Sequence, residues 1–210
     1  MVWRRSCRVG NRKLAVGTVA YQCEEEIYRM LDSTTGFFPV IVSYGKWRDF
    51  IGEDRRDLTP EIIDSFSNTV WVDSTGFLEP QARNQYMIQA GKFGCDAIII
   101  LDTDEYLEFP LGIDFFKRQF ERIADKNPDD LSFCVTWEDS KNGTTFTPRI
   151  IMNPMFSRYR DRHNQIYFMD KEVLGNQKLV GGIVIKQDKK FRSKNRELRM
   201  RERNLRNPIH

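Results

Sequence analysis

The sequence lacks several features that mark whole classes of protein. No apolar run approaches the roughly 20 residues that a membrane-spanning helix needs, and Met1–Arg5 begin no apolar stretch as long as a secretory leader. The 4 cysteines form neither a Cys-x-x-Cys pair nor a set with histidine at zinc spacing. These absences predict a cytoplasmic protein whose cysteines are reduced and structural.

Glycine-rich phosphate loops are absent as well. Gly10, Gly17, Gly45 and Gly52 match neither the Gly-x-Gly-x-x-Gly fingerprint nor a P-loop, which argues against a dehydrogenase and against a P-loop nucleoside triphosphatase. No repeat, low-complexity tract or linker divides the 210 residues, and the hydrophobic fraction of 40% is that of a globular chain. We therefore expect one domain over residues 1–210.

The first half of the chain alternates between strand and helix patterns. The strand patterns cover residues 13–21, 38–44, 69–73 and 95–101, and the helix patterns cover residues 24–31, 57–66 and 79–91. Such alternation is typical of βαβ units and predicts an α/β fold with a mostly parallel sheet flanked by helices. A helix over 113–124, a strand over 131–137 and short strands within 148–168 predict a smaller α+β part on the same sheet.

Two carboxylates follow the most apolar of these strand patterns. The run 95–101 ends at Asp102, Thr103 and Asp104. A strand that is buried on both faces has this pattern, and ligands of a parallel sheet bind beyond the carboxyl ends of its strands. In extended backbone, Asp102 and Asp104 would share one face and could bind a single hard cation. The alternative is that two acids merely follow the end of a strand.

Together these residues resemble the nucleotide-sugar-binding half of a GT-A-fold glycosyltransferase of the large family 2 group. The resemblance rests on a first strand that ends at Tyr21, on the helix residues Ala82–Asn84, and on the Asp-x-Asp motif after the fourth strand. It covers residues 13–110 well and the remainder loosely. It implies a Rossmann-like GT-A fold and a metal-dependent, hexosyltransferase-like enzyme, which would move a sugar from a nucleotide diphosphate to a hydroxyl acceptor such as a glycan.

The resemblance also implies a donor site at one edge of the sheet. Asp102 and Asp104 would hold Mn²⁺ or Mg²⁺, which would bridge the diphosphate of a UDP- or GDP-sugar and offset the charge on the leaving group. The other donor-binding residues that it implies are Thr103, Tyr21, Tyr44, Asp73, Arg83 and Arg192. Each tyrosine could instead be an ordinary aromatic residue, half-buried at the edge of a sheet.

Residues 111–185 would then form the acceptor half, which must supply a general base because a hydroxyl is a poor nucleophile until it loses its proton. Glu138 and Asp139 follow the strand pattern 131–137. Glu138 is preferred because an acid beside a tryptophan can have a raised pKa. The alternative for both acids is a polar turn.

A third metal ligand is expected from the second half, and the resemblance points to His163. A lone histidine among arginines is more often an ordinary surface residue. Where this chain has Gln187, the family segment that resembles residues 184–193 commonly has histidine. Glutamine is a poor metal ligand, so the sequence departs from the family pattern at this position.

A basic tail over residues 186–210 closes the sequence. The formal net charge is only +3, yet this tail is crowded with lysine and arginine, Arg192 among them. Such a segment can bind nucleic acid, an anionic membrane surface or an acidic polymer, and a membrane-peripheral location is the alternative to a purely cytoplasmic one. A solvated helix face, with Glu197 and Arg201 paired, is the other interpretation. Two further functions therefore stay open: a nucleotidyltransferase-like enzyme, and a non-catalytic module that binds nucleic acid or a membrane through the tail.

Overall fold

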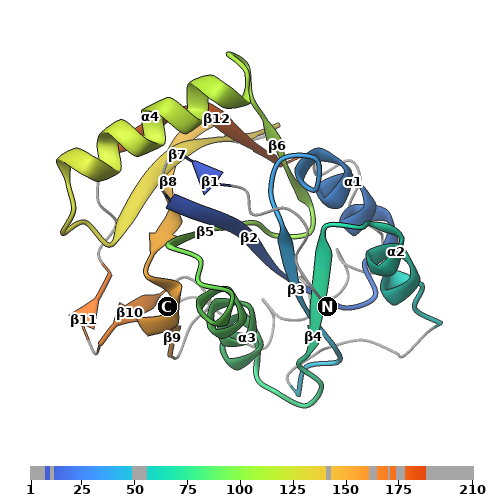
Figure 1. The fold of residues 1–210 in the computed structure, drawn as a ribbon. Coiled ribbons are helices and arrows are strands. Elements are labelled where there is room, and N and C mark those ends of the chain that lie inside the picture. The colour runs from blue at the N-terminus through green and yellow to red at the C-terminus, as the bar shows by residue number, and fades with distance from the viewer. Residues whose placement is uncertain are drawn as a thin grey trace.

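A large mixed sheet forms the centre of the molecule (Figure 1). The computed structural model describes residues 8–9, 12–48, 56–140, 143–160, 165–169, 171–173 and 178–187. Among these residues, nine strands form one sheet in the order β4-β3-β2-β5-β8-β7-β12-β6, with β1 paired to β2, and three short strands form a second sheet in the order β11-β10-β9.

The nine strands of the large sheet are β1 (Arg8–Val9), β2 (Arg12–Ala20), β3 (Val40–Tyr44), β4 (Thr69–Asp73), β5 (Ala97–Ile100), β6 (Glu105–Glu108), β7 (Ser132–Asp139), β8 (Gly143–Met152) and β12 (Leu179–Gln187). The small sheet consists of β9 (Ser157–Tyr159), β10 (Ile166–Phe168) and β11 (Lys171–Glu172).

Strand direction brings many strand ends to one edge of the large sheet. β4, β3, β2 and β5 are parallel to one another, β8 is antiparallel to both β5 and β7, and β12 is parallel to β7. The carboxyl ends of β2, β3, β4, β5, β7 and β12 therefore lie at the same edge, together with the first residue of the antiparallel strand β6. We call this the carboxyl edge. The predicted Rossmann-like α/β class is confirmed.

Helices cover both faces of the sheet. They are α1 (Glu24–Thr34), α2 (Thr59–Ser65), α3 (Glu79–Lys92) and α4 (Ile113–Lys126), and a short 3₁₀ turn, η1, spans Pro154–Phe156. No helix in the described ranges is long and apolar enough to cross a membrane.

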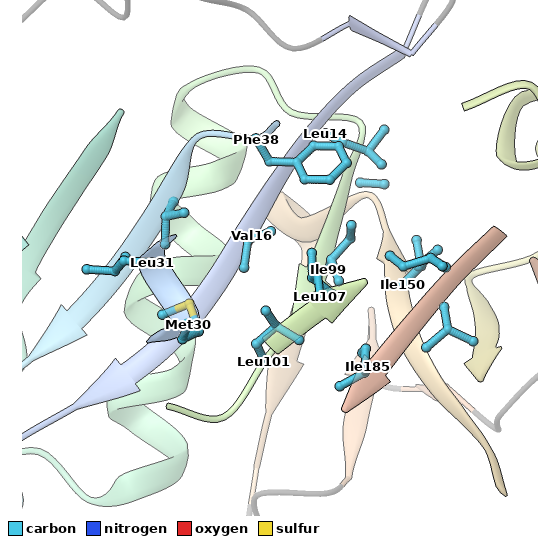
Figure 2. Close-up of a cluster of buried hydrophobic side chains, with 14 of the residues drawn as sticks. Leu14, Val16, Met30, Leu31, Phe38, Ile99, Leu101, Leu107, Ile150 and Ile185 are labelled. Carbon is cyan, nitrogen blue, oxygen red and sulfur yellow. The ribbon is translucent and has the colours of Figure 1, made fainter. Parts of the chain in front are cut away.

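Alternation along the strands assigns apolar side chains to two cores. Leu14 and Val16 of β2 pack with side chains of α1 and α4 on one face (Figure 2). Ala15, between them in sequence, packs with side chains of α3 on the other face. The sheet thus lies between α1 and α4 on one face and α3 on the other.

Close packing of α3 on β2 depends on Gly17. A Cβ atom there would lie 2.6 Å from Ile98 Cδ1 and 2.6 Å from Tyr86 Cδ2. Both atoms belong to buried side chains, so a methyl group would overpack the core at a cost of about 1–3 kcal/mol. The absence of a side chain lets α3 approach the sheet, and α3 carries Arg83.

Candidate functional site

The chain turns immediately after β5. Thr103 and Asp104 form a turn, which is closed by the backbone N–H of Glu105 donating to the carbonyl of Asp102 at 3.0 Å. The expectation that Asp102 and Asp104 share one face of an extended strand is therefore wrong, because a turn ends the two-residue alternation. This turn connects β5, in the middle of the sheet, with β6, one of the two strands at its edges.

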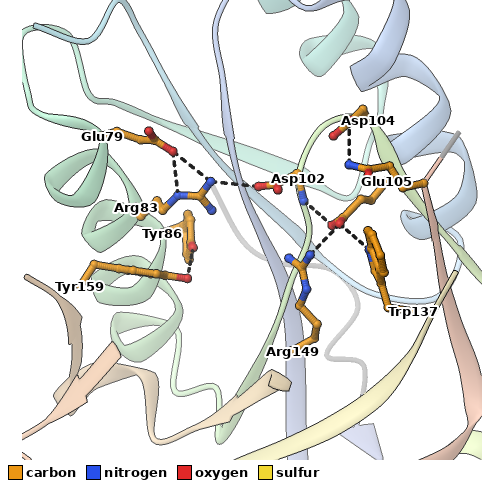
Figure 3. A network of polar contacts seen from close by, with 10 residues as sticks. Glu79, Arg83, Tyr86, Asp102, Asp104, Glu105, Trp137, Arg149 and Tyr159 are labelled. Carbon is orange, nitrogen blue, oxygen red and sulfur yellow. Dashed lines mark hydrogen bonds and ion pairs between the residues drawn. The ribbon is translucent and has the colours of Figure 1, made fainter. Parts of the chain in front are cut away.

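Asp102 is held from α3. Arg83 Nη2 lies 2.9 Å from Asp102 Oδ1 and 3.1 Å from Glu79 Oε1 (Figure 3). Burial acts to lower the pKa of the Arg83 guanidinium, but Asp102, followed by Tyr86, Tyr159 and Glu79, outweighs it and holds that pKa above its usual range. The side chain of Asp102 remains 30% exposed, whereas that of Arg83 is 7% exposed. Arg83 thus stays charged and orients a carboxylate that solvent can still reach.

The small sheet contacts Arg83 through Tyr159. The guanidinium carbon of Arg83 lies 5.8 Å from the ring centroid of Tyr159 in β9, within the range of a cation–π contact. Asn84 donates to the Tyr159 carbonyl at 2.8 Å and accepts from its backbone N–H at 2.7 Å. Asn84, which the resemblance includes, therefore fixes β9 against α3.

Asp104 is held from the last described strand. Gln187 Nε2 donates to Asp104 Oδ2 at 2.9 Å, and the two residues are 9% and 7% exposed. Gln187 ends β12 in register with Asp139 of β7 and Glu105 of β6. Directly paired residues point to the same face of a sheet. Gln187, Asp139 and Glu105 therefore form one row at the carboxyl edge.

Glu105 ties the turn to the second half of the chain. Its Oε1 accepts from Trp137 Nε1 at 2.9 Å and from Arg149 Nη2 at 2.6 Å, and its Oε2 accepts from the backbone N–H of Asp102 at 2.8 Å (Figure 3). Burial raises the pKa of Glu105 to about 7, and Arg149 opposes that rise. The sequence gives no sign of Arg149, because no local spacing relates it to an acid 44 residues earlier.

The two candidate tyrosines meet at the ends of β2 and β3. The ring centroids of Tyr21 and Tyr44 are 6.1 Å apart. Tyr44 Oη donates to Asp57 Oδ2 at 3.0 Å, and burial together with Asp57 raises the pKa of Tyr44 above its usual range. Asp57 also accepts from the backbone N–H of Gln22 at 2.9 Å. Asp57, which no sequence motif singles out, therefore fixes the tyrosine pair and the loop after β2.

Asp73 lies beside this tyrosine pair, but its carboxylate accepts a hydrogen bond within the turn after β4. It ends β4 directly opposite Tyr44, and its carboxylate accepts from the backbone N–H of Thr75 at 2.9 Å. The hydrogen bonds from Thr75 lower the pKa of Asp73. The side chain is exposed at the carboxyl edge.

The two candidate bases face opposite sides of the sheet. Glu138 pairs in register with Lys186, and its Oε2 lies 3.6 Å from Lys186 Nζ, at 40% exposure of the glutamate side chain. Asp139, in contrast, is 4% exposed and lies in the row with Gln187. Asp139 is therefore paired directly with Gln187, the residue that donates to Asp104, whereas Glu138 is paired with Lys186.

The strand order and directions, with two acids directly beyond the fourth parallel strand, decide the type of fold. The fold is GT-A-like. No protein-family model matches the chain, and no curated protein matches its sequence.

Three solved structures have a distantly similar fold. S. aureus TarS 1–349 in complex with UDP aligns with 62% of this chain at 18% identity and a TM-score of 0.39, and this chain spans 37% of its length. A 4-diphosphocytidyl-2C-methyl-D-erythritol synthase aligns with 70% of this chain and 78% of its own, at 10% identity and a TM-score of 0.39. The mannose-1-phosphate geranyltransferase of Thermus thermophilus aligns with 83% of this chain and 57% of its own, at 12% identity and a TM-score of 0.31.

The residues that the structure describes include only part of the expected metal site. His163, Arg192 and the basic tail beyond Gln187 lie outside the described residues. Within the described ranges, no three His, Cys, Asp or Glu side chains group closely enough to hold a metal ion. The carboxylates of Asp102 and Asp104 are suitable ligands for Mn²⁺ or Mg²⁺, but each already accepts a hydrogen bond from another side chain.

Proposed function

We propose that this GT-A-like chain is a glycosyltransferase, which moves a sugar from a nucleotide-diphosphate-sugar donor to a hydroxyl acceptor. One observation carries the proposal: groups suited to each part of such a donor converge on the carboxyl edge from separate strands. An aromatic pair ends β2 and β3, and a partly exposed carboxylate oriented by a buried arginine follows β5. Ligands of open α/β sheets bind at this edge.

The donor would lie across these strand ends. Tyr21 and Tyr44 offer aromatic surface for a nucleobase, and we propose Asp102 and Asp104 as the residues that hold Mn²⁺ or Mg²⁺ at the diphosphate. When bound, such an ion offsets the negative charge that develops on the leaving diphosphate. Arg83 keeps Asp102 oriented, and Glu105 holds the backbone of the turn.

The acceptor hydroxyl needs a base on the same edge, and we propose Asp139. Its oxygen would take the hydroxyl proton while the acceptor oxygen forms a bond to the anomeric carbon of the sugar. The bond from that carbon to the phosphate oxygen breaks, and the nucleotide diphosphate leaves with the electron pair. Burial of Asp139 and its place in the row with Gln187 and Glu105 support this role.

The donor site is tested by nucleotide binding and donor hydrolysis. UDP-sugars and GDP-sugars are offered with Mn²⁺, with free nucleoside triphosphates as competitors, and binding is measured by calorimetry. Asp104→Asn keeps an acceptor oxygen for Gln187 but removes the charge, so we expect Mn²⁺-dependent nucleotide binding to weaken about tenfold or more, which is ~1.4 kcal/mol.

The result can also contradict the proposal. Turnover of a nucleoside triphosphate without hydrolysis of any sugar nucleotide would identify a nucleotidyltransferase instead. A chain that binds DNA or anionic vesicles but no nucleotide would be a binding module.

The acceptor would extend around the carboxyl edge: its reacting hydroxyl would lie at Asp139, and a more distant part of the acceptor would lie on the opposite, exposed face that β7, β8 and β12 share. Phe146 of β8 is 63% exposed and pairs with Thr136, which places it on the same face as Glu138 and Lys186. An exposed aromatic ring beside charged groups suits a sugar, because the ring packs on its C–H face while polar groups bind its hydroxyls.

Phe146→Ala is accordingly expected to raise the acceptor KM about tenfold, since stacking of this kind contributes ~1 kcal/mol or somewhat more. Donor hydrolysis should be unchanged. The matched control is Phe156→Ala, which removes a ring of similar exposure, 58%, from η1. An equal rise in KM for both variants would disprove the assignment of this face.

A further inference from the structure

We propose that Gln187 is an internal competitor for the divalent cation, and that its hydrogen bond to Asp104 weakens metal binding until the side chain swings away. This inference rests on the proposed function, since it concerns the metal site assigned there to Asp102 and Asp104. It predicts that this chain binds Mn²⁺ weakly without nucleotide, and that the identity of residue 187 sets the affinity.

The competition is for one oxygen atom. Gln187 Nε2 approaches Asp104 Oδ2 to 2.9 Å, and an amide N–H presents the positive end of its dipole to the carboxylate. A cation that used this oxygen would have to take the place of that donor. Both residues are buried, at 9% and 7% exposure, so water does not readily replace the lost bond, and a buried donor left without an acceptor is unfavourable.

The backbone of Gln187 cannot move away with ease. It is paired on one side with Glu105 of β6 and on the other with Asp139 of β7. The side chain, in contrast, can rotate about its own single bonds while the backbone keeps its pairing. The switch between the two arrangements is therefore a rotation of one side chain, and it needs no change in the sheet.

The charge of the side chain at position 187 sets the direction of the expected change in Mn²⁺ affinity. Gln187 is neutral, whereas glutamate at the same place would set a second carboxylate beside Asp104. Removal of the donor alone abolishes the competition, and replacement by an acid adds a ligand of the kind that Mn²⁺ and Mg²⁺ prefer. The order of affinities expected is therefore Gln187→Glu above Gln187→Ala above the unchanged chain.

The test is a Mn²⁺ titration of the purified full chain without nucleotide, with free Mn²⁺ counted by electron paramagnetic resonance. We expect Gln187→Glu to bind Mn²⁺ about tenfold more tightly and Gln187→Ala about threefold more tightly than the unchanged chain. Addition of Asp104→Asn to Gln187→Glu should abolish the gain. Gln119→Glu, which adds the same charge on α4, is the matched control and should bind as the unchanged chain does.

The proposal is overturned if neither Gln187 variant binds Mn²⁺ more tightly, if no variant binds it at all, or if Gln119→Glu gains as much. Gln187→Ala keeps the test valid if the glutamate variant does not fold. Failure of the proposed function is a separate result, because it would show as absent binding of UDP and absent hydrolysis of sugar nucleotides, whatever the order of the Mn²⁺ affinities.

Discussion

Asp139→Asn is expected to lower the rate of sugar transfer by about 10²–10⁴-fold, the usual contribution of a positioned general base. The amide cannot accept the hydroxyl proton, but it keeps the size and most hydrogen-bonding capacity of the buried acid, which is 4% exposed. Nucleotide affinity should change little, since the proposed donor contacts come from other residues. Single-turnover measurements of transfer, with binding measured separately, check this prediction.

Glu138→Gln is the matched control, because it makes the same chemical change at the neighbouring position. Glu138 is a partly exposed acid beside Lys186, and ion pairs that solvent reaches contribute ~1 kcal/mol or less. We expect the rate to change by less than about fivefold, the equivalent of ~1 kcal/mol. If the two variants exchange these effects, Glu138 is the base; if both transfer sugar at the unchanged rate, neither is.

Arg149→Met is expected to lower the free energy of unfolding by about 3–5 kcal/mol, because removal of one partner leaves a buried charge without compensation. Arg149 Nη2 lies 2.6 Å from Glu105 Oε1, and the glutamate side chain is 1% exposed. Lys178→Met is the matched control. Its ion pair with Asp130 is also short, 2.6 Å, but the lysine side chain is 45% exposed, and we expect a loss of less than about 1 kcal/mol.

The loss in Arg149→Met should grow as the pH rises. Burial raises the pKa of Glu105 from 4.5 to about 7 in the folded chain, and removal of the arginine raises that pKa further. Between the unfolded and folded pKa values the folded chain binds more protons, so stability falls with rising pH; below both values Glu105 is protonated in either state and contributes nothing. Urea unfolding in EDTA at about pH 5 and about pH 8 measures this slope. Stability of Arg149→Met that is flat or rises with pH would contradict it.

Local pattern predicted most elements of the first half. The strand expected over residues 69–73 is β4, and the helix expected over 79–91 is α3, one residue longer. In contrast, β6 has only the four residues Glu105–Glu108 and pairs with β12, far along the chain. So short a segment has no period of its own, and its pairing partner cannot be identified without the fold. Periodicity reports burial along one element, not the register between distant ones.

In the candidate site, too, local sequence patterns predicted the residues at strand ends but not their distant partners. Tyr21 and Tyr44 end strand patterns, and Asp102 and Asp104 follow one, so the rule for strand ends predicted them at the carboxyl edge. The partners that hold them come from elsewhere in the sequence, and no local signal marks Asp57, Arg149 or the contact of Gln187.

The preference for Glu138 as the base rested on its neighbour Trp137, but adjacent residues of a strand face opposite sides. The indole of Trp137 in fact donates to Glu105, and it is Glu105 whose pKa burial raises to about 7.

The crossing from β5 to β6 has a consequence for how the chain matures on the ribosome. Asp104 is synthesised 83 residues before Gln187, and β6 cannot join the sheet until β12 has emerged to pair with it. Contacts between segments so distant form late. The acidic turn therefore lacks its Gln187 contact until residue 187 has been synthesised, and pairing of β6 with β12 then completes this edge of the sheet and the turn together.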